Sequence, residues 1–457
     1  MPPRDRARRF ILPAALTLVL GAATGAALPA GAPGSANANA NANVNATATA
    51  AADAGPAEAY DLVIRRGHVI DPKNGLDGVR DVAVKDGKIA KVAKRIDASA
   101  AKKTVNAAGE YVTPGLIDLH AHLFPGPEDD YANGKNGVAP DGFTFRSGVT
   151  TAVDTGSSGA ANFELFKKKI IDRSETRVLA FLNIVRKGMA GHEAEQDVSD
   201  MNPGAAAEMA RKHPETIVGI KTAHYEGKDW VPVENTVRAG EDAGVPAMVD
   251  FGANHPERPL KTLLNEKLRP GDIYSHAYSG LRGELGEDGK INPALQQGRD
   301  RGILFDVGHG GGSFDWNVAV PAMEEGFTPD AISTDLHISS MNSGMKDMSN
   351  LMSKFLALDM PLKDVVAAST WKPAQAIQRP DLGNLSVGSP ADLAVFSLDK
   401  GRFGYVDSFG FRLDGSRKLT TELTVRAGKV VWDLNGRAAQ KWTPGASKEG
   451  GTQQHRH

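Results

Sequence analysis

Eight short apolar runs recur along the middle of the chain, and longer segments of a different pattern separate them. The runs cover residues 115–119, 150–154, 178–185, 217–221, 247–251, 273–276, 303–307 and 331–334. Segments such as 162–172, 203–212, 293–301 and 348–358 carry apolar residues at helical spacing. Fully apolar strands that alternate with helices indicate an α/β fold with a parallel sheet covered on both faces. Eight repeats favour a closed (β/α)8 TIM-type barrel over an open doubly wound sheet, and such a barrel places its active site at the carboxyl ends of the strands.

Both ends of the folded region show a different pattern, in which apolar and polar residues alternate around tight turns. Residues 60–112 alternate in this way, with a clear turn signal at Asp86 and Gly87, and the pattern returns at 391–396 and 423–431. We therefore expect a small β-sandwich domain formed by residues 58–113 and 381–440, with the barrel at 114–380 between its two parts.

The two termini have compositions that do not suit a packed core. Basic residues precede an apolar run at 10–27, which is too short and too rich in Ala and Gly for a spanning helix. We predict a signal peptide at 1–34, a disordered Ala/Asn-rich tether at 35–57 and a disordered tail at 441–457. The mature protein is then periplasmic or secreted and has no stable membrane insertion. The adjacent Arg8 and Arg9 are compatible with export by the twin-arginine route, but they do not establish it.

Charge and cysteine content narrow the functional classes. The chain has 53 Lys and Arg against 55 Asp and Glu, a net charge of −2, so it lacks the basic excess of a nucleic-acid binder. It has no cysteine, which excludes disulfides, a thiol nucleophile and a thiolate metal site. Any metal must rest on histidine, carboxylate or a modified side chain. We expect a small-molecule substrate and no nucleic acid, and a homo-oligomer is an open alternative because barrels of this kind are frequently oligomeric.

Chemistry-bearing residues stand where several of the runs end. The first run leads into PGLIDLHAH, which places His120 and His122 two residues apart in an extended segment, so both imidazoles can reach one metal. The fourth run ends at Lys221, which burial would keep either paired with an acid or neutral. A neutral amine can take up carbon dioxide and become a carbamate, which binds two divalent ions as a carboxylate does.

Two further strand ends carry His276 and Asp335, in the segments DIYSHAYSG and AISTDLH. Taken singly, such a histidine is more often a core residue and such an aspartate is more often a helix cap. Their recurrence at successive strand ends is the stronger signal, because a barrel would bring all of them together.

These motifs together resemble the amidohydrolase superfamily, in its binuclear branch with a carboxylated lysine. The resemblance extends over residues 60–437, and the segments LRPGDIYSH, FDVGHGGGSF and ISTDLH are similar to a deacetylase or dihydroorotase-like group of metallohydrolases. It implies two divalent ions, zinc or alternatively manganese, with N-carboxylated Lys221 between them. The family pattern assigns His120, His122, Lys221 and Asp335 to one ion, and Lys221, His276 and a strand-five histidine to the other.

The fifth run departs from this pattern, because PAMVDFGAN places Asp250 where the family has a histidine. Two interpretations follow. Asp250 ligates the second metal itself, since a carboxylate suits zinc or manganese. Alternatively, His224, which follows Lys221 after a bend, supplies the missing nitrogen. A site for a single metal is the third outcome.

Other candidates are weaker. His309 begins a glycine-rich loop whose backbone N–H groups could meet an anion, and His337 follows Asp335 by two residues. Candidates for holding a substrate carboxylate are Tyr225, Arg186 and Arg282.

The resemblance implies a metal-dependent hydrolase that cleaves an amide or ester bond of a small, carboxylate-bearing substrate through a metal-bridging hydroxide. Asp335 would accept the proton of the water and deliver it to the leaving group. A ring deaminase on the same scaffold is the nearest alternative, although Lys221 argues against it. The other alternative is a periplasmic binding protein without catalytic activity, which is suggested by the departure from the family pattern at Asp250.

Overall fold

The computed structural model describes residues 59–128 and 132–444. The predicted signal peptide, the predicted tether and all but four residues of the predicted tail lie outside this range. Among the helices that the model describes, none is long and apolar enough to cross a membrane.

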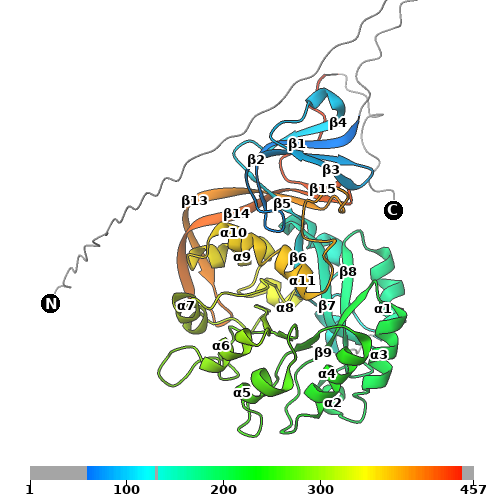
Figure 1. The fold of residues 1–457 in the computed structure, drawn as a ribbon, viewed down its shortest axis with the longest axis vertical. Coiled ribbons are helices and arrows are strands. Elements are labelled where there is room, and N and C mark those ends of the chain that lie inside the picture. Colours follow the sequence, from blue (N-terminus) through cyan, green and yellow to red (C-terminus); the bar gives the residue numbers. More distant parts are fainter. Residues whose placement is uncertain (1–58, 129–131, 445–457) are drawn as a thin grey trace, which may run out of the picture. The chain divides into compact units, whose positions relative to one another are not determined.

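The fold contains a seven-stranded parallel sheet, and Figure 1 labels its first four strands, β6 to β9. Its strands follow one another in chain order across the sheet, and each coincides with one of the first seven apolar runs. Their side chains are almost completely buried, as expected for strands covered on both faces. The strands are β6 (Leu116–Ala121), β7 (Val149–Gly159), β8 (Arg177–Asn183), β9 (Ile217–Thr222), β10 (Ala247–Val249), β11 (Ile273–Tyr274) and β12 (Leu304–Phe305).

The eighth run joins the two edges of this sheet without forming a regular strand. Ala331 pairs in parallel with Asp306 beyond β12, and Leu336 pairs in parallel with Ala121 of β6. Between these bridges the backbone N–H of Thr334 donates to the Asp118 carboxylate at 2.9 Å. In a regular β-ladder it would donate to a backbone carbonyl oxygen of the neighbouring strand. The chain then turns at Asp335, whose φ of +52° is left-handed and incompatible with a strand.

Helices follow the strands and pack against them, and the four helical segments predicted from spacing correspond to α1, α3, α6 and α9. Side-chain caps begin several of them; for example, Asn202 accepts from the backbone N–H of Ala205 at the start of α3. The main helices are α1 (Phe163–Lys169), α2 (His192–Gln196), α3 (Pro203–Lys212), α4 (Val231–Ala243), α5 (Leu260–Thr262), α6 (Pro293–Asp300), α7 (Trp316–Glu324), α8 (Ile338–Asn342), α9 (Met348–Ala357), α10 (Leu362–Ala367) and α11 (Trp371–Ala376).

A second sheet is built from both ends of the folded chain, as the alternating pattern predicted. Its eight strands have the order β15-β14-β13-β5-β1-β2-β3, with β4 paired to β1, and the two chain ends meet where β5 pairs with β13. The strands are β1 (Tyr60–Asp71), β2 (Leu76–Lys85), β3 (Lys88–Ala93), β4 (Ala101–Asn106), β5 (Tyr111–Pro114), β13 (Leu393–Val406), β14 (Arg412–Arg426) and β15 (Lys429–Asp433).

Hydrogen bonds connect all eight strands of the domain that was predicted as a sandwich into one mixed sheet. Strand β1 is long enough to pair with β4 along residues 60–65 and with β5 at residues 68–69, on the same edge. A register shift between Ile64 and Gly67 separates the two halves of β1. Buried side chains from both chain ends, among them Leu62, Val84, Val395 and Val425, share one apolar core in this sheet.

Candidate metal centre

The structure brings together the polar side chains predicted at the strand ends. His120 and His122 come from the end of β6, Lys221 from β9 and His276 from the end of β11, and all four are at most 6% exposed. Asp335 joins them from the eighth run, 8% exposed. Ligand atoms of His120, His276 and Asp335 lie within 4.8 Å of one another, which is close enough for one ion to bind all three.

The Asp335 carboxylate lies among nitrogen atoms that could share a cation with it. Its Oδ1 is 2.9 Å from Nε2 of His122 and 3.7 Å from Nε2 of His120, and the Lys221 Nζ is 3.3 Å from the same His120 nitrogen. Oδ1 is buried and receives no hydrogen bond of good geometry from any residue that the structure describes. A buried, unpartnered carboxylate oxygen is costly, and a bound divalent ion would satisfy it. The residues present therefore fit a metal ion.

The imidazoles are held by their other ring nitrogen. Ser275 Oγ donates to the Asp306 Oδ2 at 2.7 Å and so accepts from the His120 Nδ1, 2.9 Å away. The Nδ1 of His276 donates to the Gly308 carbonyl oxygen at 2.6 Å. Both arrangements leave Nε2 unprotonated toward the cluster, which is the usual way that a protein orients a metal-binding histidine.

Burial and charge set the protonation of the cluster. Burial lowers the pKa of His120 to about 3, and the nearby Lys221 acts in the same direction, so this imidazole is neutral. Burial also lowers the pKa of Lys221, although Asp250 and Asp335 oppose the shift. Burial alone would raise the pKa of Asp335, but His120 and His122 hold it well below its usual range. A neutral imidazole and an ionised carboxylate are the forms that bind metal.

Asp250 stands at the end of β10, beside His276, and is 3% exposed. Its Oδ1 accepts from the Arg282 guanidinium at 2.6 Å, and its Oδ2 is 3.5 Å from Nε2 of His276 and 3.4 Å from Nε2 of His224. Burial opposes ionisation of this carboxyl, but Arg282 and His276 hold its pKa well below the usual range. Asp250, His224 and Arg282 thus belong to one cluster with His276.

Sequence reasoning missed the residues that hold the imidazoles. Glu195 contacts the Nδ1 of His224 at 3.2 Å, and Ser275 and Asp306 hold His120 as described. Asp306 had a visible signal, because a single carboxylate interrupts the seventh apolar run. Glu195 lies in α2, in a polar segment where nothing distinguishes it from its neighbours.

The glycine-rich loop after β12 contacts the cluster through its backbone rather than through His309. The His309 Nδ1 bonds to the Gly310 carbonyl oxygen at 2.9 Å, and Nε2 lies 2.7 Å from the ammonium of Lys354. Both ring nitrogens therefore have protein partners. A Cβ at Gly310 would lie 2.4 Å from the Asp335 carboxylate, so glycine is required for the loop to pass this close.

The three remaining candidates, His337, Tyr225 and Arg186, differ in whether they lie near Asp335. His337 lies 3.9 Å from Asp335 through Nε2, and its Nδ1 accepts from a backbone N–H at the start of α8. Tyr225 donates to Asp229 at 2.5 Å, away from the cluster. Arg186 is half exposed and lies 3.7 Å from Asp200. Among these three, His337 alone is within reach of Asp335.

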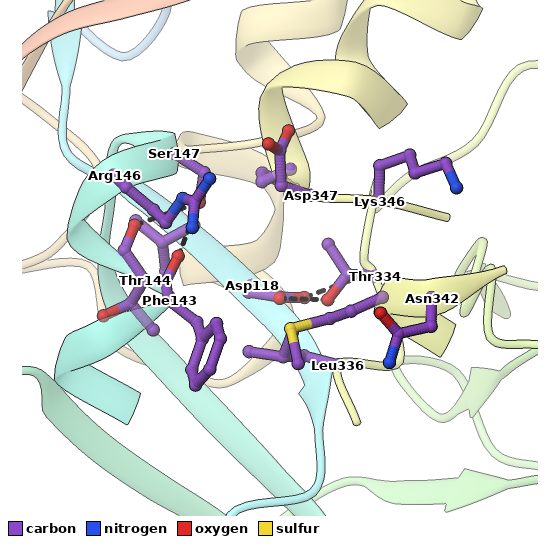
Figure 2. A pocket seen from close by; sticks show the side chains of 13 residues that line it. Asp118, Phe143, Thr144, Arg146, Ser147, Thr334, Leu336, Asn342, Lys346 and Asp347 are labelled. Carbon is purple, nitrogen blue, oxygen red and sulfur yellow. Dashed lines mark hydrogen bonds between the residues drawn. The ribbon is translucent and has the colours of Figure 1, made fainter. Parts of the chain in front are cut away.

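A separate cavity of about 310 Å³ lies beside β6 and the eighth run, and Figure 2 shows its lining. The Asp118 carboxylate lines it while bonded to Thr334, and burial raises the pKa of Asp118 to about 7. None of the candidate ligands lines this cavity, so it is distinct from the cluster. Its charged or amide-bearing side chains are Asp118, Arg146, Asn342, Lys346 and Asp347.

Comparison with known proteins agrees with this geometry. Residues 313–431 match the amidohydrolase family. A deacetylase of Brucella anthropi is 35% identical over 343 residues, which cover 73% of this chain and 83% of the relative. A deacetylase of Agrobacterium fabrum is 36% identical over 333 residues, with 71% and 80% covered. Among solved structures, an adenine deaminase superposes with a TM-score of 0.74 at 28% identity, covering 82% of this chain and all of that one. A dihydroorotase superposes with a TM-score of 0.71 at 31% identity, with 84% and 99% covered.

Proposed function

The chain belongs to the amidohydrolase family, and from that premise we propose that it hydrolyses an amide or ester bond of a small, carboxylate-bearing substrate with divalent ions. The observation that carries this proposal is the buried Asp335 Oδ1, unpartnered and within 4 Å of two imidazoles whose second nitrogens are held by protein groups. The deacetylase relatives support removal of an acyl group as the reaction.

Bound divalent ions would supply Lewis acidity, which polarises a scissile carbonyl and lowers the pKa of water. His120, His122, His276 and Asp335 would hold them, at the strand ends of a closed (β/α)8 barrel. Asp335 is ionised, so its carboxylate can take the proton that an attacking water would lose. It then returns that proton to the departing nitrogen or oxygen.

Lys221 would act as a carbamate. Lys221 is 1% exposed, and burial lowers its pKa, which favours the neutral form that reacts with carbon dioxide. A carbamate carries two oxygens and negative charge into a cluster that otherwise relies on Asp250 and Asp335 for anionic ligands. Carboxylated Lys221 would then help to hold two divalent ions, zinc or manganese.

A ring deaminase is the second candidate, and the similarity to an adenine deaminase structure favours it. The two reactions share attack by water, but only deamination releases ammonia. An assay for ammonia therefore distinguishes them directly.

The decisive experiment is a hydrolysis screen with protein first freed of metal and then given zinc or manganese. N-acetyl amino acids are paired with the matching O-acetyl hydroxy acids, and acetate and ammonia are both measured. Acetate release that depends on metal supports the proposal and assigns amide or ester preference. Ammonia release from purines or pyrimidines without acetate release would contradict it, and no turnover in any metal form would favour a binding protein.

We also propose that the chain is exported and acts in the periplasm or outside the cell, on the basis of its first 57 residues. Cell fractionation with an antibody to the mature chain would test this. Recovery of the full-length chain in the cytoplasm alone would contradict it.

A further inference from the structure

We infer that Lys354 and His309 are positioning residues for the metal centre, which act by fixing the glycine-rich loop of residues 308–313 against two of the candidate ligands. The inference gives His309 a role other than the anion binding expected from the sequence. It rests on the proposed function only in assuming that His276 and Asp335 bind a divalent ion.

The loop contacts these two ligands through its backbone. The Gly308 carbonyl oxygen accepts from the Nδ1 of His276 at 2.6 Å, and a Cβ at Gly308 would lie only 2.8 Å from that nitrogen. A Cβ at Gly310 would in the same way collide with the Asp335 carboxylate. Both glycines have left-handed backbones, with φ of +47° and +56°. A shift of the loop would therefore turn the His276 ring or change the space that Asp335 occupies.

The loop is attached to the eighth run by its backbone and to a helix by one side chain. The N–H groups of His309 and Gly310 donate to carbonyl oxygens of the eighth run, at 3.1 and 3.0 Å. The His309 side chain extends to α9, where its Nε2 contacts Lys354. This side chain thus links the loop to a helix that supplies none of the candidate ligands.

The hydrogen bonds of His309 have one consistent direction. Its Nδ1 donates to the Gly310 carbonyl oxygen at 2.9 Å, and a neutral imidazole that donates from one nitrogen accepts at the other. Burial and the nearby Lys354 lower the pKa of His309 well below its usual range, so the ring is neutral. Its Nε2 therefore accepts from the Lys354 ammonium at 2.7 Å. The ring also stacks on Phe314 at a centroid distance of 4.6 Å, so it is held at both nitrogens and on one face.

Lys354 uses all three of its ammonium protons. Besides His309, it donates to the carbonyl oxygens of Gly344 and Val406, at 2.7 and 2.6 Å. The residue is completely buried, and burial of an ammonium is costly even when neutral acceptors bind it. An apolar side chain could fill this position of α9 without that cost, so the lysine indicates that its hydrogen bonds are required here.

Further contacts connect the loop to the long hairpin of the mixed sheet. Val406, which accepts from Lys354, is the last residue of β13, and Ser408 follows it in the turn before β14. The N–H of Ser408 donates to the Phe314 carbonyl oxygen at 2.9 Å, and the N–H of Phe314 donates to Ser408 Oγ at 3.1 Å. The loop is therefore held by α9 and by the hairpin, and it contacts the candidate ligands in turn.

The test is a double-mutant cycle on zinc affinity, measured by competition with a chromophoric chelator. Groups that orient metal ligands change metal affinity by about 10–100-fold, and we expect a loss of about tenfold for Lys354→Met and for His309→Ala. Because Lys354 acts through His309, the double variant should bind zinc within about twofold of His309→Ala. Losses that multiply to about a hundredfold would show that the two residues act independently, which would overturn the inference.

Two further measurements separate positioning from a general loss of stability. His309→Gln can offer a carbonyl oxygen to Lys354, so it should retain more zinc affinity than His309→Ala, and this pair carries the test if Lys354→Met does not fold. The visible absorption of bound cobalt(II), which reports the geometry of the ligands, should change in Lys354→Met and in His309→Ala. An unchanged spectrum, together with unchanged zinc affinity in the folded variants, would contradict the positioning role.

The matched control is Asp81→Asn in β2 of the mixed sheet. Asp81 is 2% exposed and accepts from the backbone N–H groups of Arg66 and Ile96, at 2.7 and 2.8 Å. This variant should lose stability yet keep the zinc affinity and the cobalt spectrum of the unaltered protein. A loss of affinity equal to that of Lys354→Met would assign the effect to stability and refute the inference. If zinc affinity responds as expected but the unaltered protein hydrolyses no substrate of the screen, the proposed function fails while the positioning role stands.

Discussion

Two histidine–carboxylate pairs in different parts of the molecule show how surroundings decide the chemistry of the same residue types. In the mixed sheet, His68 and Asp77 lie 2.5 Å apart, with side chains 40% and 56% exposed. Just beyond the parallel sheet, His122 and Asp335 lie 2.9 Å apart, with side chains only 7% and 11% exposed. Water solvates the first pair and can stabilise the charge of either side chain. The second pair sits among other buried ligands, where an ion is the natural partner.

The comparison teaches that proximity alone does not make a site. His122 is fixed by a hydrogen bond between its Nδ1 and Ser157 Oγ at 3.0 Å, and Asp335 Oδ1 receives no hydrogen bond of good geometry from the described residues. Burial, a held second nitrogen and an unsatisfied acceptor together distinguish the candidate centre from the surface pair.

The largest expected effect comes from Asp335→Asn. The amide cannot accept the proton of the attacking water, so we expect kcat to fall by roughly 10²–10⁴-fold. Steady-state kinetics on the best substrate of the screen measures the loss, and Asp77→Asn serves as the control with unchanged kcat. Unaltered turnover in Asp335→Asn would remove this residue from the mechanism.

A smaller effect is expected from Asp306→Asn, which acts through His120. Asp306 accepts from Ser275 at 2.7 Å and from Ser333 at 2.5 Å, so an amide would reverse part of this network and release the His120 ring. We expect metal affinity to fall by roughly 10–100-fold. Competition with a chelator measures it, and an affinity within twofold of the unaltered protein would show that the ring is held by other contacts.

The sequence predicted those parts of the molecule that depend on local pattern. The first seven runs became strands, four spaced segments became helices, and both chain ends entered one sheet. It could not predict contacts that arise only when distant segments meet, such as Glu195 on His224 or Arg282 on Asp250. Those contacts depend on loop conformation, including left-handed residues that no periodicity signals.

The far half of the long hairpin was also missed. Strand β13 continues as far as Val406, and strand β14 begins at Arg412. The sequence showed a strand pattern only at residues 391–396 and 423–431. Much of the extension is exposed and polar, so it lacks the apolar alternation that burial imposes. It is supported by α9 instead: the Leu419 N–H donates to Ser353 Oγ at 2.9 Å.

A third prediction concerns stability rather than catalysis. Lys354 is fully buried and donates to the carbonyl oxygens of Gly344 and Val406, at 2.7 and 2.6 Å, and to His309. Lys354→Met leaves these acceptors unsatisfied, and we expect a loss of about 2–4 kcal/mol in the free energy of unfolding. Urea denaturation measures it, and a loss below about 1 kcal/mol would contradict this role.

The pH dependence of the same variant gives an independent check. Burial lowers the pKa of Lys354 to about 7, below its value in the unfolded chain. The unfolded state therefore binds more protons between about pH 7 and pH 10, so the contribution of Lys354 to stability rises with pH across that window. The Met variant should lack this rise, and parallel stability curves for the two proteins would refute it.

The smallest effect is expected at the exposed pair. His68→Ala should change the free energy of unfolding by less than about 1 kcal/mol, because an exposed ion pair gains little over its hydrated partners. Thermal denaturation measures the change. If His68→Ala lowered the free energy of unfolding by more than Lys354→Met does, the exposure of the His68–Asp77 pair would not explain how it differs from the buried His122–Asp335 pair.

The joining of β5 to β13 has a consequence for synthesis of the protein. Val112 pairs with Val395, so the mixed sheet cannot be completed until almost the whole chain has left the ribosome. Until then β5 presents an unpaired edge, which invites wrong partners. A chain truncated before residue 393 would retain every candidate ligand yet expose this edge, so we expect premature termination to yield aggregates rather than a smaller enzyme.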